Sequence, residues 1–351
     1  MKYTAIDLFC GCGGLTEGMR QAGFDVKVAI DIDAKAVSSY KLNHPRTVVL
    51  EEDIRNVEVQ RVRDILGNRT LHLLAGCPPC QGFSGVRRLN KRTIIRDKRN
   101  NLILDYLRFV LELRPLVIMM ENVPRLVEYY LFKDVVRELK EIGYQIEIKS
   151  INVKDYGVPQ RRKRLVLIGS VLGRPNIEGP TDENLTVRDA IGDLESIEET
   201  NDPLHKITIK HSPRIKKLIK LIPKDGGSRK DLPKKYMLEC HLKEDVGFYD
   251  IYGRLKWDDC SVTITGGCLN PSKGRFLHPE EDRVITPREA LLLQSFPSDY
   301  KLSIEVGKTS LGKMIGEALP PKFSRIQSKA IRRHLDQYLC RTSSQVRNAA
   351  I

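Results

Sequence analysis

The chain has 351 residues, enough for one large domain or for a large domain with a smaller partner. It shows no basic-then-apolar leader and no apolar run of about 20 residues, so we expect a soluble, cytoplasmic protein without a membrane span. Eight cysteines are too few for a disulfide scaffold at this length, and a net charge of +14 favours a polyanionic partner, first of all nucleic acid.

The chain begins with alternating strand and helix patterns. An apolar run from Tyr3 to Phe9 breaks into Cys-Gly-Cys-Gly-Gly at 10–14, and a helical pattern follows over 15–22. A second apolar run over 26–30 ends at Asp31, about 20 positions after the glycines, where a carboxylate can accept hydrogen bonds from ribose hydroxyls. This order predicts a nucleoside-type cofactor site, the alternative being a plain strand–turn–helix unit with a solvated aspartate.

The same alternation continues to residue 169. We predict helices over 34–43, 101–113 and 133–142, and strands over 47–50, 71–75, 116–120, 145–153 and 165–169. Repeated units of this kind predict an α/β fold with a doubly wound, mostly parallel, Rossmann-like sheet. The last two strands are too close in sequence for a crossover helix, so we expect an antiparallel pair at one edge.

A rigid thiol loop follows the strand predicted over 71–75. It reads Gly-Cys-Pro-Pro-Cys-Gln-Gly-Phe-Ser over 76–84, and its two prolines restrict the backbone beside Cys80. A thiol at the carboxyl end of a buried strand lies where open α/β sheets bind ligands. We therefore predict that Cys80 carries the chemistry.

Two other chemistries use paired thiols. Cys77 and Cys80 could form a redox pair, but that motif should open a helix, and here glycine and a charged loop follow. They could also complete a zinc site with Cys10 and Cys12, whose single-residue spacing is poor for two ligands. We expect no metal.

The regular alternation stops between about residues 172 and 250. Glycine, proline and lysine dominate there, which predicts a small, irregular, basic domain with a local core of apolar side chains from Ile215, Leu218, Ile219, Leu221 and Ile222. Beyond it we predict a helix over 287–294, a last helix over 322–339 that packs on the large domain, and a frayed tail over 341–351. The predicted domains are 1–175, 176–285 and 286–351.

Seven short motifs occur in an order and spacing that resemble the DNA (cytosine-5) methyltransferases of the bacterial and archaeal restriction-modification type. They are the segments 7–14, 78–81, 121–123, 160–164, 286–290, 294–297 and 315–321. The resemblance covers both ends of the chain and leaves the irregular domain unmatched. It implies an S-adenosylmethionine-dependent methyltransferase fold with a target-recognition domain, a monomer, double-stranded DNA as partner, and a cognate restriction endonuclease acting on the same site.

The resemblance also assigns site residues. It implies S-adenosylmethionine contacts from Phe9, Gly11, Gly13, Gly14, Leu15, Asp31, Ile32, Asp53, Ile54, Pro79, Glu317 and Ala318. The basic segment after the thiol loop suggests a loop closing over DNA, with contacts from Ser84, Arg87, Arg88, Arg99 and Arg161. The chain departs from the family pattern at Glu317, where asparagine is usual, and at Cys260, where proline is usual.

The residues suit methylation at carbon 5 of cytosine. That carbon is a poor nucleophile until a thiolate adds to carbon 6, and Cys80 can supply the thiolate. Arg162 and Arg164 can favour its ionisation, and Glu121 can donate to the ring nitrogen and accept from the amine; alternatively, Glu121 only caps a strand. The base must first be flipped out of the duplex.

Two rival functions remain open. One is cytosine-5 methylation of transfer RNA by the same chemistry, although Gly82-Phe83-Ser84 resembles the DNA-acting branch. The other is a non-catalytic nucleic-acid-binding relative, against which the presence of both Cys80 and Glu121 argues.

Overall fold

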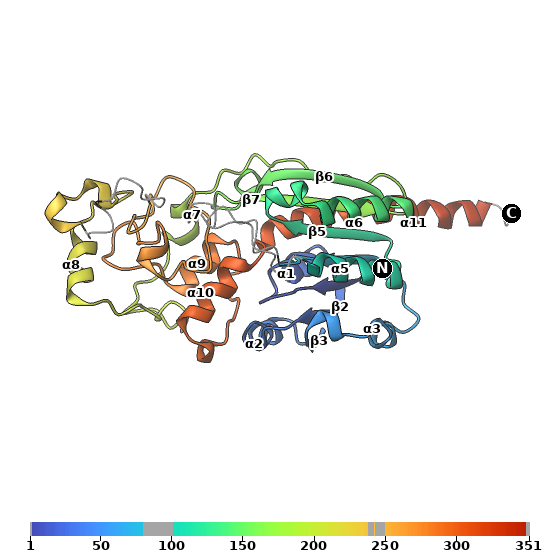
Figure 1. Cartoon of the computed structure of the whole chain (residues 1–351), viewed down its shortest axis with the longest axis horizontal. Coiled ribbons are helices and arrows are strands. Elements are labelled where there is room, and N and C mark those ends of the chain that lie inside the picture. Colours follow the sequence, from blue (N-terminus) through green and yellow to red (C-terminus); the bar gives the residue numbers. More distant parts are fainter. Residues whose placement is uncertain (1, 80–100, 238–241, 243–249, 349–351) are drawn as a thin grey trace.

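The computed structural model describes residues 2–79, 101–237, 242 and 250–348. One half of the molecule is a twisted sheet with helices on both faces, and the other half is irregular (Figure 1). No helix in the described ranges is long and apolar enough to cross a membrane.

The sheet has seven strands in the order β3-β2-β1-β4-β5-β7-β6. Strands β1 to β5 are parallel to one another, and β7 is antiparallel to both of its neighbours, β5 and β6. The predicted fold with an antiparallel edge is thus confirmed, and the reversed strand is the one next to that edge. The strands are β1 (Tyr3–Leu8), β2 (Phe24–Asp31), β3 (Val48–Glu51), β4 (Leu73–Gly76), β5 (Val117–Asn122), β6 (Gln145–Asn152) and β7 (Lys163–Ser170).

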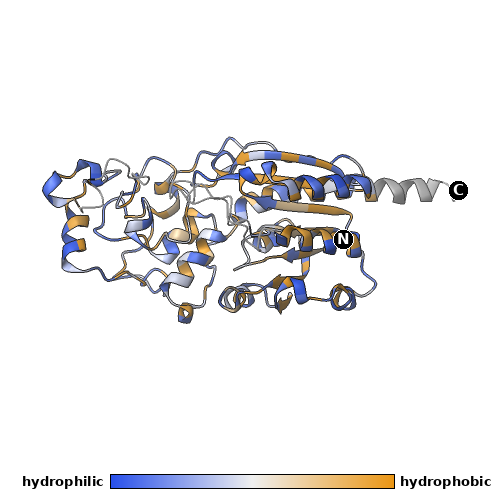
Figure 2. Cartoon of the chain, viewed as in Figure 1, coloured by the Kyte–Doolittle hydropathy of each residue, from blue (hydrophilic) through white to orange (hydrophobic). Residues whose placement is uncertain are grey.

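Both faces of the central strands are buried, as a mostly parallel sheet requires. In β5, Val117 and Met119 belong to the hydrophobic cluster under α1 and α11, whereas Ile118 and Met120 belong to the cluster under α3, α5 and α6. Figure 2 shows the corresponding hydrophobic colour along the strands. These helices are α1 (Gly14–Gln21), α3 (Val59–Leu66), α5 (Leu102–Leu113), α6 (Tyr130–Glu141) and α11 (Pro321–Asn348), and α2 (Ala34–Asn43) follows β2.

The predicted end of the last helix, and with it the frayed tail predicted from residue 341, were wrong as far as residue 348. Helix α11 runs on to Asn348 instead of ending near residue 339, because the segment 340–348 contains neither glycine nor proline to interrupt it. The end of the predicted tail, 349–351, lies outside the described residues.

The irregular half contains α7 (Val187–Ile191), α8 (Pro213–Leu221) and short 3₁₀ turns, with no strand among its described residues. Along α8, the apolar side chains at 215, 218, 219 and 222 follow helical spacing and face inward, but Leu221 is out of that register and exposed, which corrects its predicted core position. The same core cluster also contains residues of α9 (Pro287–Leu293) and α10 (Lys308–Glu317).

Candidate active site

The glycine turn lies at the carboxyl end of β1, where the first helix begins. Its ends are joined by a hydrogen bond from the Gly13 amide to the Cys10 carbonyl, 2.9 Å long. Phe9, Gly11 and Gly13 all have positive φ, which is costly for the phenylalanine. A side chain on Gly13 would come within 2.6 Å of the Tyr300 hydroxyl, so both its backbone angle and its packing require glycine.

Asp31, at the end of β2, holds this turn. Its Oδ2 accepts the Gly11 amide at 2.7 Å, and its Oδ1 accepts the Asp33 amide at 2.8 Å. Burial raises the pKa of Asp31 above its ordinary value. The next residue, Ile32, is 66% exposed although it is apolar. An acceptor carboxylate beside an open apolar side chain fits a ligand with sugar hydroxyls and a flat apolar ring.

Leu15, Asp53 and Ile54, which were also predicted to bind the cofactor, differ in which of their atoms a ligand could contact. The side chains of Leu15 and Ile54 are buried in the two hydrophobic clusters of the sheet. Asp53 pairs with Arg55, whose hydrogen bond to the carboxylate holds the pKa of Asp53 below its ordinary value. Only the backbones of Leu15 and Ile54, and the partly occupied carboxylate of Asp53, are therefore available to a ligand.

The motif over 315–321 lies at the end of α10 and reaches the glycine turn. Glu317 is exposed at the end of that helix and Ala318 is half-buried after it. A side chain on Gly14 would overlap the Leu319 carbonyl and contact the Ala318 side chain, so these two residues lie against the start of α1. Segments from the two ends of the sequence thus meet at one site.

The base of the thiol loop is tied to β5. The Asn122 side-chain amide donates to the Pro78 carbonyl at 2.7 Å, and the Val123 amide donates back to the Asn122 side-chain oxygen. Pro79 is half-buried, as is Cys77, and burial raises the pKa of the Cys77 thiol well above its ordinary value. Five predicted site residues lie outside the described ranges, namely Cys80, Ser84, Arg87, Arg88 and Arg99.

A buried ion pair lies beside that loop base. The Nε of Arg164, on β7, is 2.6 Å from the Oε1 of Glu121, which is 7% exposed at the end of β5. The antiparallel pairing of β5 with β7 brings these strand ends together. Two of the predicted catalytic residues are thus neighbours in the fold.

Arg162 has a different environment from the one its sequence suggests. Its guanidinium is buried and donates to the backbone carbonyls of Ile264 and Gly316, at 2.9 and 3.0 Å. Burial lowers the pKa of Arg162 to about 9. The side chain therefore joins the start of β7 to the irregular half and to α10. Arg161 is half-exposed and pairs with Asp259.

Two buried glutamines beside Arg162 were not predicted as site residues from the sequence. The Gln160 side chain donates to that of Gln294 at 2.8 Å and accepts the Ile264 amide at 2.8 Å. Gln294 in turn donates to the Ile315 carbonyl. Both residues stand inside recognised motifs, which was the available signal, but no local pattern indicates that they pair.

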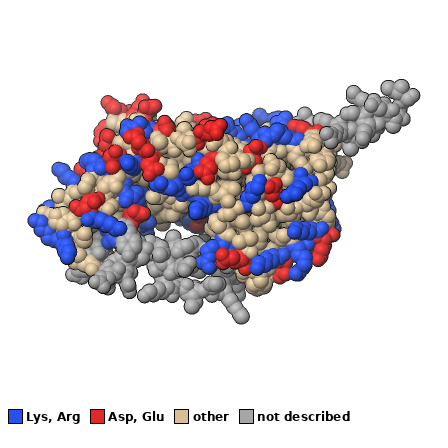
Figure 3. All heavy atoms as spheres, turned by 90° about the horizontal axis from the view of Figure 1, so that it is seen from above, with Lys and Arg blue, Asp and Glu red and all other residues tan. Residues whose placement is uncertain are grey.

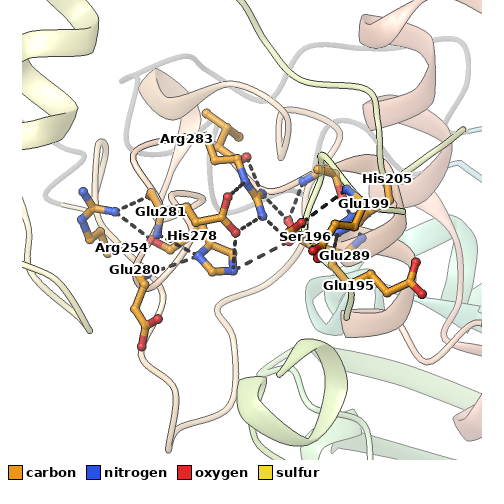
Figure 4. Close-up of polar contacts among 12 residues, drawn as sticks. Glu195, Ser196, Glu199, His205, Arg254, His278, Glu280, Glu281, Arg283 and Glu289 are labelled. Carbon is orange, nitrogen blue, oxygen red and sulfur yellow. Dashed lines mark hydrogen bonds and ion pairs between the residues drawn. The ribbon is translucent and has the colours of Figure 1, made fainter. Parts of the chain in front are cut away.

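The first turn of helix α9 is fixed by polar contacts with the irregular half. Arg283 donates to both Glu281 and Glu289 (Figure 4). Thr286 and Glu289 form a reciprocal cap at the start of the helix. The Nδ1 of His205 also forms a 2.9 Å hydrogen bond with the Thr286 hydroxyl. Among the described residues, no group of three or more His, Cys, Asp or Glu side chains is arranged to hold a metal ion.

Comparisons with known proteins agree with this arrangement. The family model for C-5 cytosine-specific DNA methylases matches residues 3–333. The chain is 35% identical to the Type II methylase M.HgiDII of Herpetosiphon aurantiacus, over 96% of this chain and 97% of that protein. It is 31% identical to the Type II methyltransferase M1.HphI of Haemophilus parahaemolyticus, over 94% and 87%.

Solved structures share the fold. A protein encoded within an Escherichia coli prophage superimposes with a TM-score of 0.74 at 24% identity, covering 95% of this chain and all of that one. The Entamoeba histolytica methyltransferase EhMeth gives a TM-score of 0.66 at 17% identity, covering 95% and 99%. At these identities the likeness supports the architecture alone.

Proposed function

The chain belongs to the family of C-5 cytosine-specific DNA methylases, and on that premise we propose that it methylates a flipped cytosine from S-adenosylmethionine through a covalent adduct on Cys80. Membership makes it a DNA cytosine-5 methyltransferase of the Type II restriction-modification kind. The observation that carries the finer proposal is the buried Glu121–Arg164 pair, which lies next to the chain that enters Cys80.

The turn at the carboxyl end of β1 suits S-adenosylmethionine. Asp31 would accept the ribose hydroxyls and Ile32 would cover the adenine, with Asp53 and the backbone of Gly11 and Gly13 completing the pocket. When bound there, the cofactor supplies an electrophilic methyl group. Phe9, Gly14, Pro79, Glu317 and Ala318 border the same edge of the sheet and are proposed as further contacts.

Cys80 would open the reaction on the base. Its thiolate forms a bond to carbon 6, and the ring electrons that this addition displaces make carbon 5 nucleophilic. Glu121 would hold the ring nitrogen and exocyclic amine, while Arg164 positions that carboxylate and adds positive charge beside the thiol loop. Carbon 5 would then take the methyl group, whose bond to the sulfonium sulfur breaks and leaves S-adenosylhomocysteine. Loss of the carbon 5 proton to water and elimination of the thiolate would release the methylated base.

Double-stranded DNA would lie between the two halves of the molecule. We propose a catalytic domain over 1–175, a target-recognition domain over 176–285 and a returning segment over 286–351. Lys and Arg side chains gather at the end of the irregular half that carries α8, which suits phosphate contacts (Figure 3). Arg161 and the basic residues 87, 88 and 99 are proposed DNA contacts, and an endonuclease of the same specificity is the proposed partner in the cell.

Bisulfite sequencing of DNA from a host that expresses the chain tests this proposal. We expect methylation in one short sequence context, its loss in Cys80→Ala, and a reduction of at least about a hundredfold in Glu121→Gln. Cys77→Ala is the matched control, because it removes the other thiol of the same loop and should leave methylation intact.

Two results would contradict the assignment. Full activity in Cys80→Ser would exclude the covalent route. Transfer of labelled methyl groups to transfer RNA but not to DNA would favour the RNA-acting alternative.

A further inference from the structure

The loop after α9 packs its aromatic side chains directly against the glycine turn. The ring centroids of Phe296 and Tyr300 are 4.7 Å apart. A Cβ on Gly14 would lie 3.1 Å from the Phe296 ring, and one on Gly13 would lie 2.6 Å from the Tyr300 hydroxyl. The two rings therefore form the floor beneath the turn.

Tyr300 also makes a hydrogen bond to the turn itself. Its hydroxyl donates to the Cys12 carbonyl at 2.6 Å, although the two residues are 288 positions apart in sequence. The hydroxyl has one hydrogen, so its other contact, with Nε2 of His44 at 3.1 Å, must be one that it accepts. Burial lowers the pKa of His44 to about 4, so at neutral pH this ring is uncharged, with its hydrogen on Nε2.

The turn is thus held at two peptide groups. Asp31 accepts the Gly11 amide on one side of Cys12, and Tyr300 donates to the carbonyl on the other side. Gly11 and Gly13 have wide backbone freedom, and they bring no side chain to restrict it. The orientation of the peptide groups beside Cys12 therefore depends on these two external hydrogen bonds, together with the contacts of Gly13, whose amide donates to the Cys10 carbonyl and whose backbone bonds to His44.

Hydrogen bonds to the backbone of Tyr300 and of the next residue hold the tyrosine in place. Its own carbonyl accepts from Arg288 at 2.9 Å. The next residue, Lys301, exchanges two hydrogen bonds with the Asn43 side chain at the end of α2, at 2.9 and 2.7 Å. The ring is buried, so solvent does not compete for the hydroxyl.

We propose that Tyr300 is a positioning residue for the cofactor site, whose hydroxyl fixes the Cys12–Gly13 peptide and so preforms the turn that binds S-adenosylmethionine. This inference rests on the proposed function. Tyr300 acts through the turn and does not itself touch the cofactor. Its hydroxyl lowers the cost of ordering the turn when the ligand binds.

Tyr300→Phe tests the proposal, because it removes the hydroxyl and keeps the ring. Titration calorimetry with S-adenosylhomocysteine should show a dissociation constant raised about tenfold, the worth of one buried hydrogen bond. At saturating S-adenosylmethionine, the turnover number should stay within about twofold of the unmodified protein, since the reacting groups are untouched.

Tyr144→Phe is the matched control. Tyr144 is also buried and also donates to a backbone carbonyl, that of Pro115, but it belongs to the cluster on the other face of the sheet. We expect both variants to lose similar thermal stability and only Tyr300→Phe to lose cofactor affinity. Equal affinities in the two variants would overturn the proposal.

A third variant covers the case in which Tyr300→Phe does not fold. His44→Phe removes the donor to the Tyr300 oxygen together with the His44 hydrogen bond to the Gly13 backbone, and it should raise the dissociation constant by at least about threefold. No change would then count against the proposal. If the unmodified protein itself bound no S-adenosylhomocysteine, the proposed cofactor would be wrong, which is a distinct result.

Discussion

Asp7 is fully buried in β1, and in the described part of the chain only one of its carboxylate oxygens has a hydrogen-bond donor. That donor is the Thr16 hydroxyl, 2.6 Å from Oδ2. Burial raises the pKa of Asp7 from 3.8 to about 7. An acid whose pKa is raised by folding stabilises the fold while it is protonated, so this contribution is lost as the pH rises toward and through 7.

Asp7→Asn should remove that pH dependence, because the amide does not ionise. We expect the stability of the unmodified protein relative to the variant to fall by roughly 2 to 3 kcal/mol between about pH 5 and about pH 8. Urea denaturation at both pH values measures it. A constant difference would show that Asp7 titrates as an ordinary carboxyl group.

At the scale of elements, the site depends on how closely α10 approaches the segment around Thr265. A Cβ on Gly316 would overlap the Thr265 backbone, and Arg162 donates to the Gly316 carbonyl at the same place. Gly312, one turn earlier, has the Gly266 carbonyl 3.1 Å from its Cβ position. The two glycines let the helix lie directly on this backbone.

Gly316→Ala should therefore separate α10 from that segment. We expect a loss of roughly 2 to 4 kcal/mol in the free energy of unfolding and a weaker affinity for S-adenosylhomocysteine. Gly179→Ala is the control, since nothing lies within 4 Å of its Cβ position. Equal stability of the two variants would mean that α10 can shift without cost.

At the scale of the whole molecule, the buried side chain of Arg254 ties together separate segments of the irregular half. Arg254 donates to the backbone carbonyls of Ile219, Ile222, His278 and Glu281, and it pairs with Asp282. No strand satisfies the backbone in the described part of this half, so arginine side chains such as Arg254 pair with its carbonyls. The glycine turn at 10–14 is instead held by Asp31 and Tyr300.

Arg254→Met should consequently separate the two binding activities. We expect DNA affinity to fall at least about tenfold, while S-adenosylhomocysteine affinity stays within about twofold. Fluorescence anisotropy and calorimetry measure the two. Arg188→Met serves as control because its pair with Asp258 is exposed and should matter little. Parallel loss of both affinities would contradict the proposed domain division.

Local patterns predicted much of the fold. Helix α2 has the predicted bounds, and most strands fall within about two residues of their predicted ends, because period and flanking glycine or proline are local properties. Helix α3 was not predicted, although Val59, Val62 and Leu66 have helical spacing and are buried. Helix α10 was not predicted either, since its two glycines disfavour a helix that tertiary packing then stabilises.

The sequence by itself determined the alternating elements, the ordered motifs and therefore the family. Tertiary structure alone decided that Arg162 joins β7 to Gly316, that Gln160 contacts Gln294, and that Tyr300 donates to the glycine turn at Cys12. These contacts link residues 154, 134 and 288 positions apart. No periodic pattern in the sequence indicates a hydrogen bond between residues so far apart, because the two partners come together only when distant elements have packed.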